Sequence, residues 1–198
     1  MKDKEFFQDY INAFLKQNSI LNLISKNDEK YIWEKHIFDS LAIEKFFTKY
    51  QKVNNATLLD IGTGGGFPSV PIALCNPEIE VYALDSIRKK INAIENLKSE
   101  LAIKNLHTIC DRAENVCEKY DLITSRAVAP MSKILEYALP LLKKDGYFIA
   151  YKSVRAEDEI KDAQGVLKKY NAKICDVIEY ELPLEENFTR KLVVTRFV

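Results

Sequence analysis

Apolar residues recur with helical spacing over the first fifty residues of the chain. In the second half of this stretch Trp33, Ile37 and Leu41 recur every four residues, a spacing that places them along one face of a helix. No glycine or proline interrupts the stretch. The pattern therefore predicts an α-helical cap over residues 1–50.

After a polar break at residues 51–56, short apolar segments alternate with helical ones. The apolar segments are rich in β-branched and aromatic residues, as strands are, and they lie at 57–61, 80–84, 106–110, 121–125 and 146–151. The helical segments between and after them lie at 68–75, 88–101, 131–142 and 156–169. Strands separated by helices of this length pair in parallel through right-handed crossovers, so we expect an open sheet with helices on both faces.

The alternation stops at the C-terminal end of the chain. Residues 173–181 and 190–197 both have the composition of strands and no helical segment separates them, so they must pair antiparallel or lie apart. A parallel sheet that finishes with an antiparallel strand is typical of the class I methyltransferases, whereas an NAD-binding Rossmann domain stays parallel. The predicted fold is therefore α/β: a Rossmann-like, mostly parallel seven-stranded sheet over residues 56–198, in a single domain with the N-terminal helical cap.

Composition narrows the class of protein further. Of the 198 residues, 47% are hydrophobic, which suffices for one core. Apolar runs fall short of the roughly 20 residues of a membrane span, and the charged N-terminus lacks the apolar segment of a signal peptide, so we expect a cytoplasmic protein that does not cross a membrane. Lysine plus arginine and aspartate plus glutamate both number 29, so any nucleic-acid site must be a local basic patch.

The four cysteines show no metal-ligand spacing. None stands in a C-x-x-C motif or beside a pair of histidines, which argues against a zinc site and against a disulfide framework. We expect reduced thiols that act as small buried hydrophobic residues, and we expect no metal.

The sequence DIGTGGGFP at residues 60–68 is the most informative motif. Glycines at a strand-to-helix turn let the backbone approach a ligand closely, and free amides at the helix start favour a phosphate or a carboxylate. Phe67 stands where the dinucleotide motif requires a small residue, and no Gly-Lys-Ser/Thr follows the loop, so the NAD and Walker motifs both fail. The remaining pattern is D-x-G-x-G-x-G, formed by Asp60, Gly62, Gly64 and Gly66, and it is typical of proteins that bind S-adenosylmethionine (SAM).

Acidic residues follow the next two strands. Asp85 stands 23 residues beyond Gly62, where a carboxylate can accept both ribose hydroxyls; the alternative is that it only caps the following helix. After the third strand, the Ala113 amide could donate to a ring nitrogen of adenine and Glu114 could accept from the exocyclic amine. The alternative for that segment is a solvated acidic loop.

The end of the fourth strand, where such enzymes handle the methyl acceptor, lacks common catalytic motifs. It carries no N-P-P-Y or D-P-P-Y, which disfavours methylation of an exocyclic amine, and no cysteine after a proline, which removes the covalent route to carbon five of a pyrimidine. We therefore expect an acceptor that is already nucleophilic, such as an aromatic ring nitrogen, which needs placement and exclusion of water but no base. Ser125 and Arg126 are the positioning candidates, with a surface salt bridge as the alternative for Arg126.

Several blocks together resemble one family, the small-subunit ribosomal RNA methyltransferase G family. They are NLIS at 22–25, HIFDSL at 36–41, DIGTGGGFP at 60–68, LDS at 84–86 with Lys90, RAE at 112–114 and TSRA at 124–127. The resemblance implies a SAM-dependent enzyme that methylates N7 of one guanine in 16S ribosomal RNA. It also implies a set of cofactor-binding residues, namely Gly62, Phe67, Ala113, Glu114 and Arg126.

Basic residues at helix starts and strand ends are the expected RNA contacts; they are Lys35, Arg88, Lys152 and Arg155. His36, Asp39 and Ser40 either form a hydrogen-bond cluster between helices or line the acceptor site, where a neutral His36 would be suited to orienting a guanine. We expect a monomer whose partner is 16S ribosomal RNA or the small ribosomal subunit. The alternatives are a SAM-dependent enzyme acting on a small molecule or protein, and a non-catalytic nucleotide-binding module.

Overall fold

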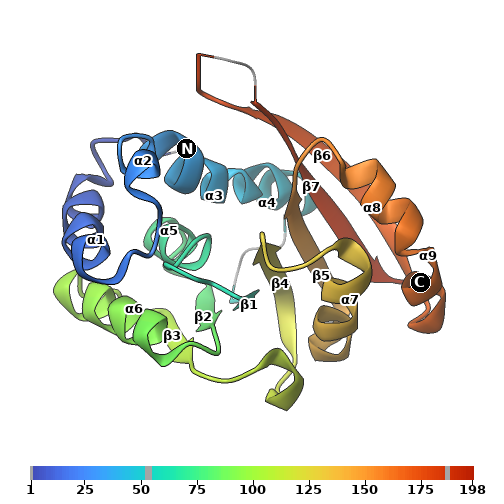
Figure 1. Cartoon of the computed structure of the whole chain (residues 1–198). Coiled ribbons are helices and arrows are strands. Elements are labelled where there is room, and N and C mark those ends of the chain that lie inside the picture. The colour runs from blue at the N-terminus through green and yellow to red at the C-terminus, as the bar shows by residue number, and fades with distance from the viewer. Residues whose placement is uncertain (1, 52–54, 186–187) are drawn as a thin grey trace.

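The computed structural model describes residues 2–51, 55–185 and 188–198 (Figure 1). The part of the chain before the sheet is helical, as predicted, although residues 52–54 of the polar break lie outside the described residues. Its elements are α1 (Gln8–Leu21), α2 (Lys26–Glu29), η1 (Ile32–Phe38), α3 (Asp39–Leu41) and α4 (Ile43–Tyr50). We call these elements the cap.

One turn of the cap differs from the predicted α-helix. The segment η1 is a π-helix, whose i→i+5 hydrogen bonds make it wider than an α-helix. The four-residue spacing of Trp33, Ile37 and Leu41 is slightly longer than one turn of an α-helix and slightly shorter than one turn of a π-helix. Ile37 and Leu41 are fully buried, and Trp33 is partly buried against the same core.

The described strands form one seven-stranded sheet with the order β3-β2-β1-β4-β5-β7-β6. Strands β1 to β5 pair in parallel, and β7 pairs antiparallel with both β5 and β6. The mostly parallel sheet with an antiparallel last strand is therefore confirmed, and β7 lies inside the sheet, between β5 and the edge strand β6. The strands are β1 (Thr57–Ile61), β2 (Glu80–Leu84), β3 (Leu106–Ile109), β4 (Tyr120–Arg126), β5 (Leu142–Lys152), β6 (Ala172–Leu182) and β7 (Phe188–Phe197).

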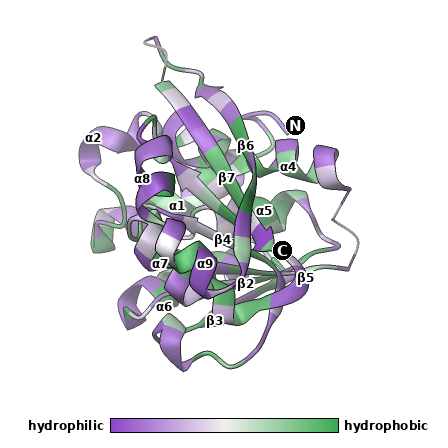
Figure 2. Ribbon diagram, turned by 90° about the vertical axis from the view of Figure 1, so that its right-hand side faces the viewer, coloured by the Kyte–Doolittle hydropathy of each residue, from purple (hydrophilic) through white to green (hydrophobic). Residues whose placement is uncertain are grey.

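Helices cover both faces of this sheet (Figure 1). Leu58 and Leu59 are neighbours on β1 and point to opposite faces, so Leu58 joins the core under the cap while Leu59 joins the core on the other face. Figure 2 shows hydrophobic residues along the central strands and hydrophilic residues on outer helices such as α8. The helices of the first face are α5 (Ser69–Cys75) and α6 (Arg88–Glu100); those of the second are α7 (Met131–Ala138), α8 (Ala156–Asp162) and α9 (Gln164–Lys169).

Two predicted helices are shorter than expected. The helix predicted at 131–142 ends at Ala138, where the 3₁₀ turn η3 (Leu139–Leu141) contains Pro140, which has no amide to continue the helix. Leu142 already belongs to β5. The helix predicted at 156–169 is interrupted at Ala163, whose amide is shared between the carbonyls of Glu159 and Ile160.

The strand order reverses between β1 and β4. The chain leaves β1 toward β2 and leaves β4 toward β5, so the loops after β1 and β4 diverge and open a crevice at the carboxyl ends of these strands. The glycine loop and the segment after Arg126 both lie at this crevice. No helix of the described part of the chain is long and apolar enough to cross a membrane.

Candidate active site

The loop after β1 folds back onto the end of β2. The amides of Gly62 and Thr63 both donate to the Leu84 carbonyl, at 2.8 and 2.9 Å, and the Gly64 amide donates to Asp85 Oδ2 at 3.0 Å. Gly62 and Gly64 have φ values of 71° and 59°, a left-handed conformation that glycine adopts without steric cost. The structure thus joins the glycine loop to the carboxylate predicted to be its partner.

A cavity of about 430 Å³ opens beside this loop. Gly62, Asp85, Ala113 and Glu114 line it, Ala113 and Glu114 from the 3₁₀ turn η2 (Ala113–Asn115) that follows β3. A Cβ added to Gly64 would meet nothing nearer than the Gly62 carbonyl at 4.0 Å, so space is open there too. We call this space the cofactor cavity.

Asp85 caps the start of α6 and also lines the cofactor cavity, so its contact with a ribose stays a prediction. Its Oδ1 accepts from the Ile87 amide at 2.9 Å, just before α6, and its Oδ2 accepts from Gly64 while the residue lines the cofactor cavity. Lys90 Nζ lies 3.6 Å from Oδ2 and balances the charge. One carboxylate therefore fixes the start of α6, shapes the glycine loop and remains at the cavity wall.

Asp60 lies beneath the glycine loop and is fully buried. Its Oδ1 accepts from Thr124 Oγ1 at 3.0 Å, while Oδ2 has no hydrogen-bond partner among the described residues. Burial raises the pKa of this carboxyl to about 6. Asp60 lines neither the cofactor cavity nor the one described below, so direct contact of its carboxyl with a cofactor stays a prediction.

Phe67 and Gly66 face the cap and α5 and do not line the cofactor cavity. The Phe67 ring packs against the rings of Phe14 and His36, each at 5.0 Å between centroids. Gly66 has a φ of 92°, and a Cβ there would stand 2.6 Å from Val70 Cγ2. Both residues therefore fix how the loop packs, and direct contact of either with a cofactor stays a prediction.

A second cavity of about 550 Å³ adjoins the first, and Ala127 and Val128 line both. We call it the acceptor cavity. Cap and core build it together from mostly polar residues, which include Lys35, His36, Asp39, Arg126, Tyr151, Lys152, Arg155, Glu159 and Arg190.

Several predicted site residues meet in this second cavity, whereas Ser40, Ser125 and Arg88 do not line it. Ser125 is buried, and its hydroxyl donates to the Ile61 carbonyl at 3.2 Å. Arg88, at the start of α6, lines neither cavity. Arg190 does line the acceptor cavity, although it was missed because nothing in the sequence distinguishes it from other charged residues of a C-terminal strand.

Arg126 is held by the cap. Its Nη1 donates to Asp39 Oδ2 at 2.8 Å, and the Tyr180 hydroxyl donates to the other oxygen of Asp39 at 2.6 Å. The Arg126 and Asp39 side chains are only 15% and 7% exposed, so this is a largely buried ion pair rather than the surface salt bridge considered above. The guanidinium also lies over the Phe67 ring, 5.4 Å from its centroid.

His36 belongs both to a hydrogen-bond cluster and to the wall of the acceptor cavity. Its Nδ1 lies 3.3 Å from Nη2 of Arg126; since a guanidinium can only donate, Nδ1 accepts and Nε2 carries the hydrogen. Its carbonyl accepts from Ser40 Oγ at 2.6 Å. Burial and the Arg126 charge lower the pKa of His36 to about 4, so the imidazole is neutral at physiological pH.

The loop at residues 127–130 forms the wall between the two cavities, and Lys152 ties it down. Lys152 Nζ donates to the Ala129 carbonyl at 2.8 Å and to Glu159 Oε2 at 2.7 Å. Glu159 in turn accepts from the Met131 amide at 2.9 Å. Because the Lys152 side chain is only 10% exposed, its ammonium is engaged within the protein, and its contact with RNA stays a prediction.

The cysteines differ in part from the expectation. All four are free thiols, but Cys117 is exposed and the others are only partly buried. The prediction of buried thiols is therefore wrong for Cys117, which lies in the loop before β4. No group of three or more potential metal ligands was found in the described ranges.

The strand order, the glycine loop with its acidic partner and the adjoining acceptor cavity define a class I methyltransferase. Solved structures share the fold at low sequence identity. TrmN from Thermus thermophilus superposes with a TM-score of 0.64 at 14% identity, covering 83% of this chain and 53% of that chain. The ribosomal protein L11 methylase from Lactobacillus delbrueckii gives 0.60 at 18% identity, covering 80% and 79%.

The chain belongs to the rRNA small subunit methyltransferase G (GidB) family, which matches residues 3–186. The Ribosomal RNA small subunit methyltransferase G of Listeria monocytogenes serotype 4b is 36% identical over 196 residues, covering 96% of this chain and 81% of that protein. That of Lactobacillus acidophilus is 39% identical over 188 residues, covering 92% and 78%. The resemblance seen in the sequence is thus confirmed: the chain is a ribosomal RNA methyltransferase, and SAM is its methyl donor.

Proposed function

We propose that this enzyme methylates N7 of one guanine in 16S ribosomal RNA of the small ribosomal subunit. The observation that supports this most directly is the pair of cavities that share the wall formed by Ala127 and Val128. One cavity carries carboxylates suited to a nucleoside, and the other carries basic groups suited to RNA. The methyl group would therefore be transferred from the cofactor to the base across the boundary that the two cavities share.

The residues around the cofactor cavity fit SAM, whose sulfonium supplies an electrophilic methyl group. Asp85 would accept the ribose hydroxyls. The Ala113 amide and the Glu114 carboxylate would bind adenine, and the open space at Gly64 would admit the rest of the molecule.

The acceptor cavity would orient the guanine and supplies no general base. Guanine N7 has a lone pair and no proton to lose, so in-line placement and exclusion of water suffice. Asp39 is engaged by Arg126 and Tyr180. The basic nitrogen of His36 faces Arg126, and the pKa of that imidazole is about 4. Neither residue is free to remove a proton, which suits an acceptor that needs no deprotonation.

The charges at the acceptor cavity suit an RNA backbone. Its two carboxylates, Asp39 and Glu159, are each paired with a cation, whereas Arg155 and Arg190 form no ion pair among the described residues. These arginines, with Lys35, would bind phosphates, and Arg88 would extend the contact along the surface. We propose that the enzyme acts in the cytoplasm, as a monomer of one domain, on RNA of the small subunit.

Transfer of labelled methyl groups to small subunits tests this function. The subunits are taken from a strain that lacks the enzyme, and methylated positions are mapped by chain cleavage at N7-methylguanine. We expect one labelled guanine in 16S ribosomal RNA. Label in protein or in a small molecule, with none at guanine N7, would contradict the proposal and favour the alternative acceptors.

A further inference from the structure

A third cavity, of about 500 Å³, adjoins the acceptor cavity, and Lys35 lines both. One side of it comes from the start of η1 and the residue before it, through Tyr31, Glu34 and Lys35. The other side comes from Leu184, which follows β6, and from Phe188 at the start of β7. The cavity is therefore next to the place where the target base would bind, on the side where cap and sheet meet.

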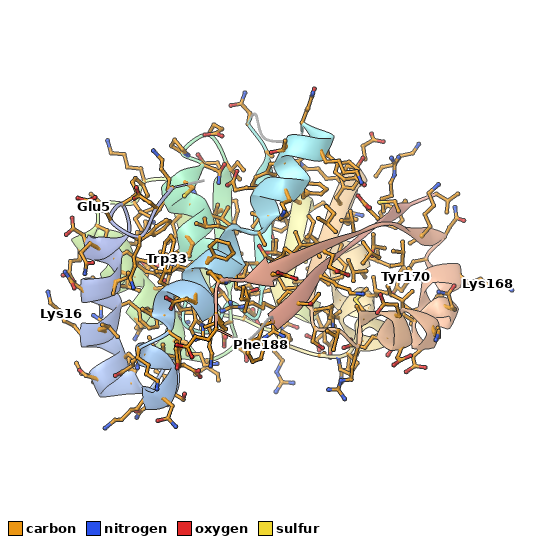
Figure 3. All side chains as sticks on the ribbon, turned by 90° about the horizontal axis from the view of Figure 1, so that it is seen from above. Glu5, Lys16, Trp33, Lys168, Tyr170 and Phe188 are labelled. Carbon is orange, nitrogen blue, oxygen red and sulfur yellow. The ribbon has the colours of Figure 1, made fainter. Side chains whose placement is uncertain are left out.

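Two of the residues that line this cavity are solvent-exposed aromatic residues. Phe188 is 42% exposed and Tyr31 is 36% exposed. Figure 3 shows Phe188 near the middle of the molecule, between the N-terminal helix that carries Lys16 and the C-terminal helices near Lys168. Exposed aromatic side chains are the surfaces on which unpaired nucleobases stack.

Glu34 supplies the polar part of the cavity wall. Its Oε2 is buried and has no hydrogen-bond partner among the described residues, and a carboxylate can only accept hydrogen bonds. Glu185 also lines the cavity, so two carboxylates disfavour a phosphate at this place. The edge of a nucleobase, which carries N–H donors, would satisfy Glu34 instead.

Lys35 lies between the two cavities. Its ammonium pairs with Asp28 Oδ1 at 2.9 Å and lies 4.9 Å from the centre of the Tyr31 ring. The Lys35 and Asp28 side chains are 36% and 32% exposed, and such a pair is weak enough to be exchanged for a phosphate. If adjacent nucleotides occupied the acceptor cavity and the third cavity, the phosphate that joins them would lie near Lys35, which lines both.

We propose that the third cavity binds the nucleobase that flanks the target guanine in the RNA chain. This base stacks on Phe188 and presents N–H donors to Glu34, while Lys35 contacts the phosphate between it and the target. The proposal rests on the proposed function, because it assigns a second subsite for the same RNA. It predicts that the enzyme recognises the nucleotide next to the target guanine as well as the guanine itself.

The variant Phe188→Ala tests the stacking surface. The steady-state kinetics of methyl transfer to small subunits are compared with those of Phe6→Ala, whose ring is similarly exposed at 44% and lies outside the three cavities. We expect Phe188→Ala to raise KM for small subunits about tenfold, with SAM affinity by calorimetry and the melting temperature unchanged. Phe6→Ala should match the wild type.

The variant Glu34→Gln tests the recognition of N–H donors. A glutamine lacks the negative charge and has one acceptor oxygen in place of two, so it binds N–H donors more weakly. We therefore expect KM for small subunits to rise several-fold while SAM affinity is unchanged. Glu118→Gln, at an exposed position in the loop before β4, is the matched control. Ultraviolet crosslinking of the wild-type complex should join the peptide that contains Phe188 to the nucleotide beside the methylated guanine.

The outcomes separate this inference from the function on which it rests. If the wild type methylates one guanine N7 and Phe188→Ala and Glu34→Gln behave as their controls, the flanking-base site is wrong and the proposed function stands. A crosslink to a nucleotide far from the methylated guanine would also overturn the site. If the wild type labels no guanine N7, the proposed function fails, and the flanking-base site fails with it.

Discussion

Two buried residues near the site, His36 and Asp60, show how burial sets charge at the scale of single residues. The same desolvation that lowers the pKa of His36 to about 4 raises the pKa of Asp60 to about 6, because removal from water penalises the charged form of either group. Arg126 lowers the pKa of both residues. The result is a neutral imidazole at the acceptor cavity and a carboxyl under the glycine loop that titrates close to neutrality.

The first residue-scale prediction concerns Gly64. Its φ of 59° strains any β-branched residue, and a valine side chain there would extend into the open space that we assign to the cofactor. We expect Gly64→Val to lower SAM affinity about a hundredfold or more, measured by calorimetry. Gly165→Val, at a position with no atom within 4 Å of the added Cβ, is the control. Unchanged affinity for Gly64→Val would refute the loop assignment.

The second residue-scale prediction concerns His36 and pH. The pKa of His36 is about 4 in the folded protein against 6.5 for an ordinary histidine, so between these values the unfolded chain binds more protons and wild-type stability falls as the pH falls. His36→Asn lacks this dependence. From pH 7 to pH 5, the unfolding free energy of the variant should therefore improve relative to the wild type by up to about 2 kcal/mol, measured by urea denaturation. A difference that stays constant with pH would contradict the shifted pKa.

At the scale of elements, the loop at residues 127–130 decides how the two cavities meet. It has little regular structure of its own, and Ala127 has a φ of 57°. Its position is set by Lys152 at the end of β5 and by Glu159 in α8. The end of one strand and the side of one helix thus hold the wall between the two cavities.

Lys152→Met tests this arrangement. Without the ammonium, the Ala129 carbonyl loses its partner and the loop is free to move, so we expect the single-turnover rate to fall about tenfold through misplacement of the reacting groups. SAM affinity should change little. Glu159→Gln should also lower the single-turnover rate, and since Glu159 carries no positive charge, this loss could not come from weaker binding of RNA. The control is Lys144→Met, at an exposed position on β5, which should leave the rate unchanged. Loss of RNA affinity alone, with an unchanged rate, would assign Lys152 to the RNA instead.

At the scale of the whole molecule, the acceptor cavity exists because the cap packs on the sheet (Figure 1). Asp39 of α3, Arg126 of β4 and Tyr180 of β6 form a chain of hydrogen bonds across this junction. Phe67 packs against Phe14 of α1 at the same junction. A largely buried ion pair and aromatic packing therefore contribute to holding the cap next to the cofactor cavity.

The stability of this junction can be measured. Asp39→Ala leaves the largely buried guanidinium of Arg126 without its anion, and we expect the unfolding free energy to fall by about 3 kcal/mol. Tyr180→Phe removes only one hydrogen bond to Asp39 and should cost about 1 to 2 kcal/mol. Urea denaturation gives both values. A smaller loss for Asp39→Ala than for Tyr180→Phe would show that the ion pair does not hold the cap.

Local sequence determined much of this protein. Short runs of β-branched and aromatic residues predicted every described strand of the sheet, and apolar spacing predicted where the helices lie, because these preferences are set by the local backbone. The glycine loop and Asp85 were predicted to lie together for a different reason. The loops that follow adjacent parallel strands lie at the same edge of the sheet. The boundaries near Pro140 and Ala163 were predicted less well, because they depend on local hydrogen bonding that periodicity does not report.

Only the tertiary structure decided which way the site residues face and what they contact. Phe67 and Ser125 belong to the expected motifs, yet both side chains are buried in the protein. Lys152 is engaged by Glu159, and Phe188 meets Tyr31 at a cavity although 157 positions separate them in the chain. Side-chain direction, desolvation and charge pairing arise from contacts between distant segments, and no repeat within a single element encodes such contacts.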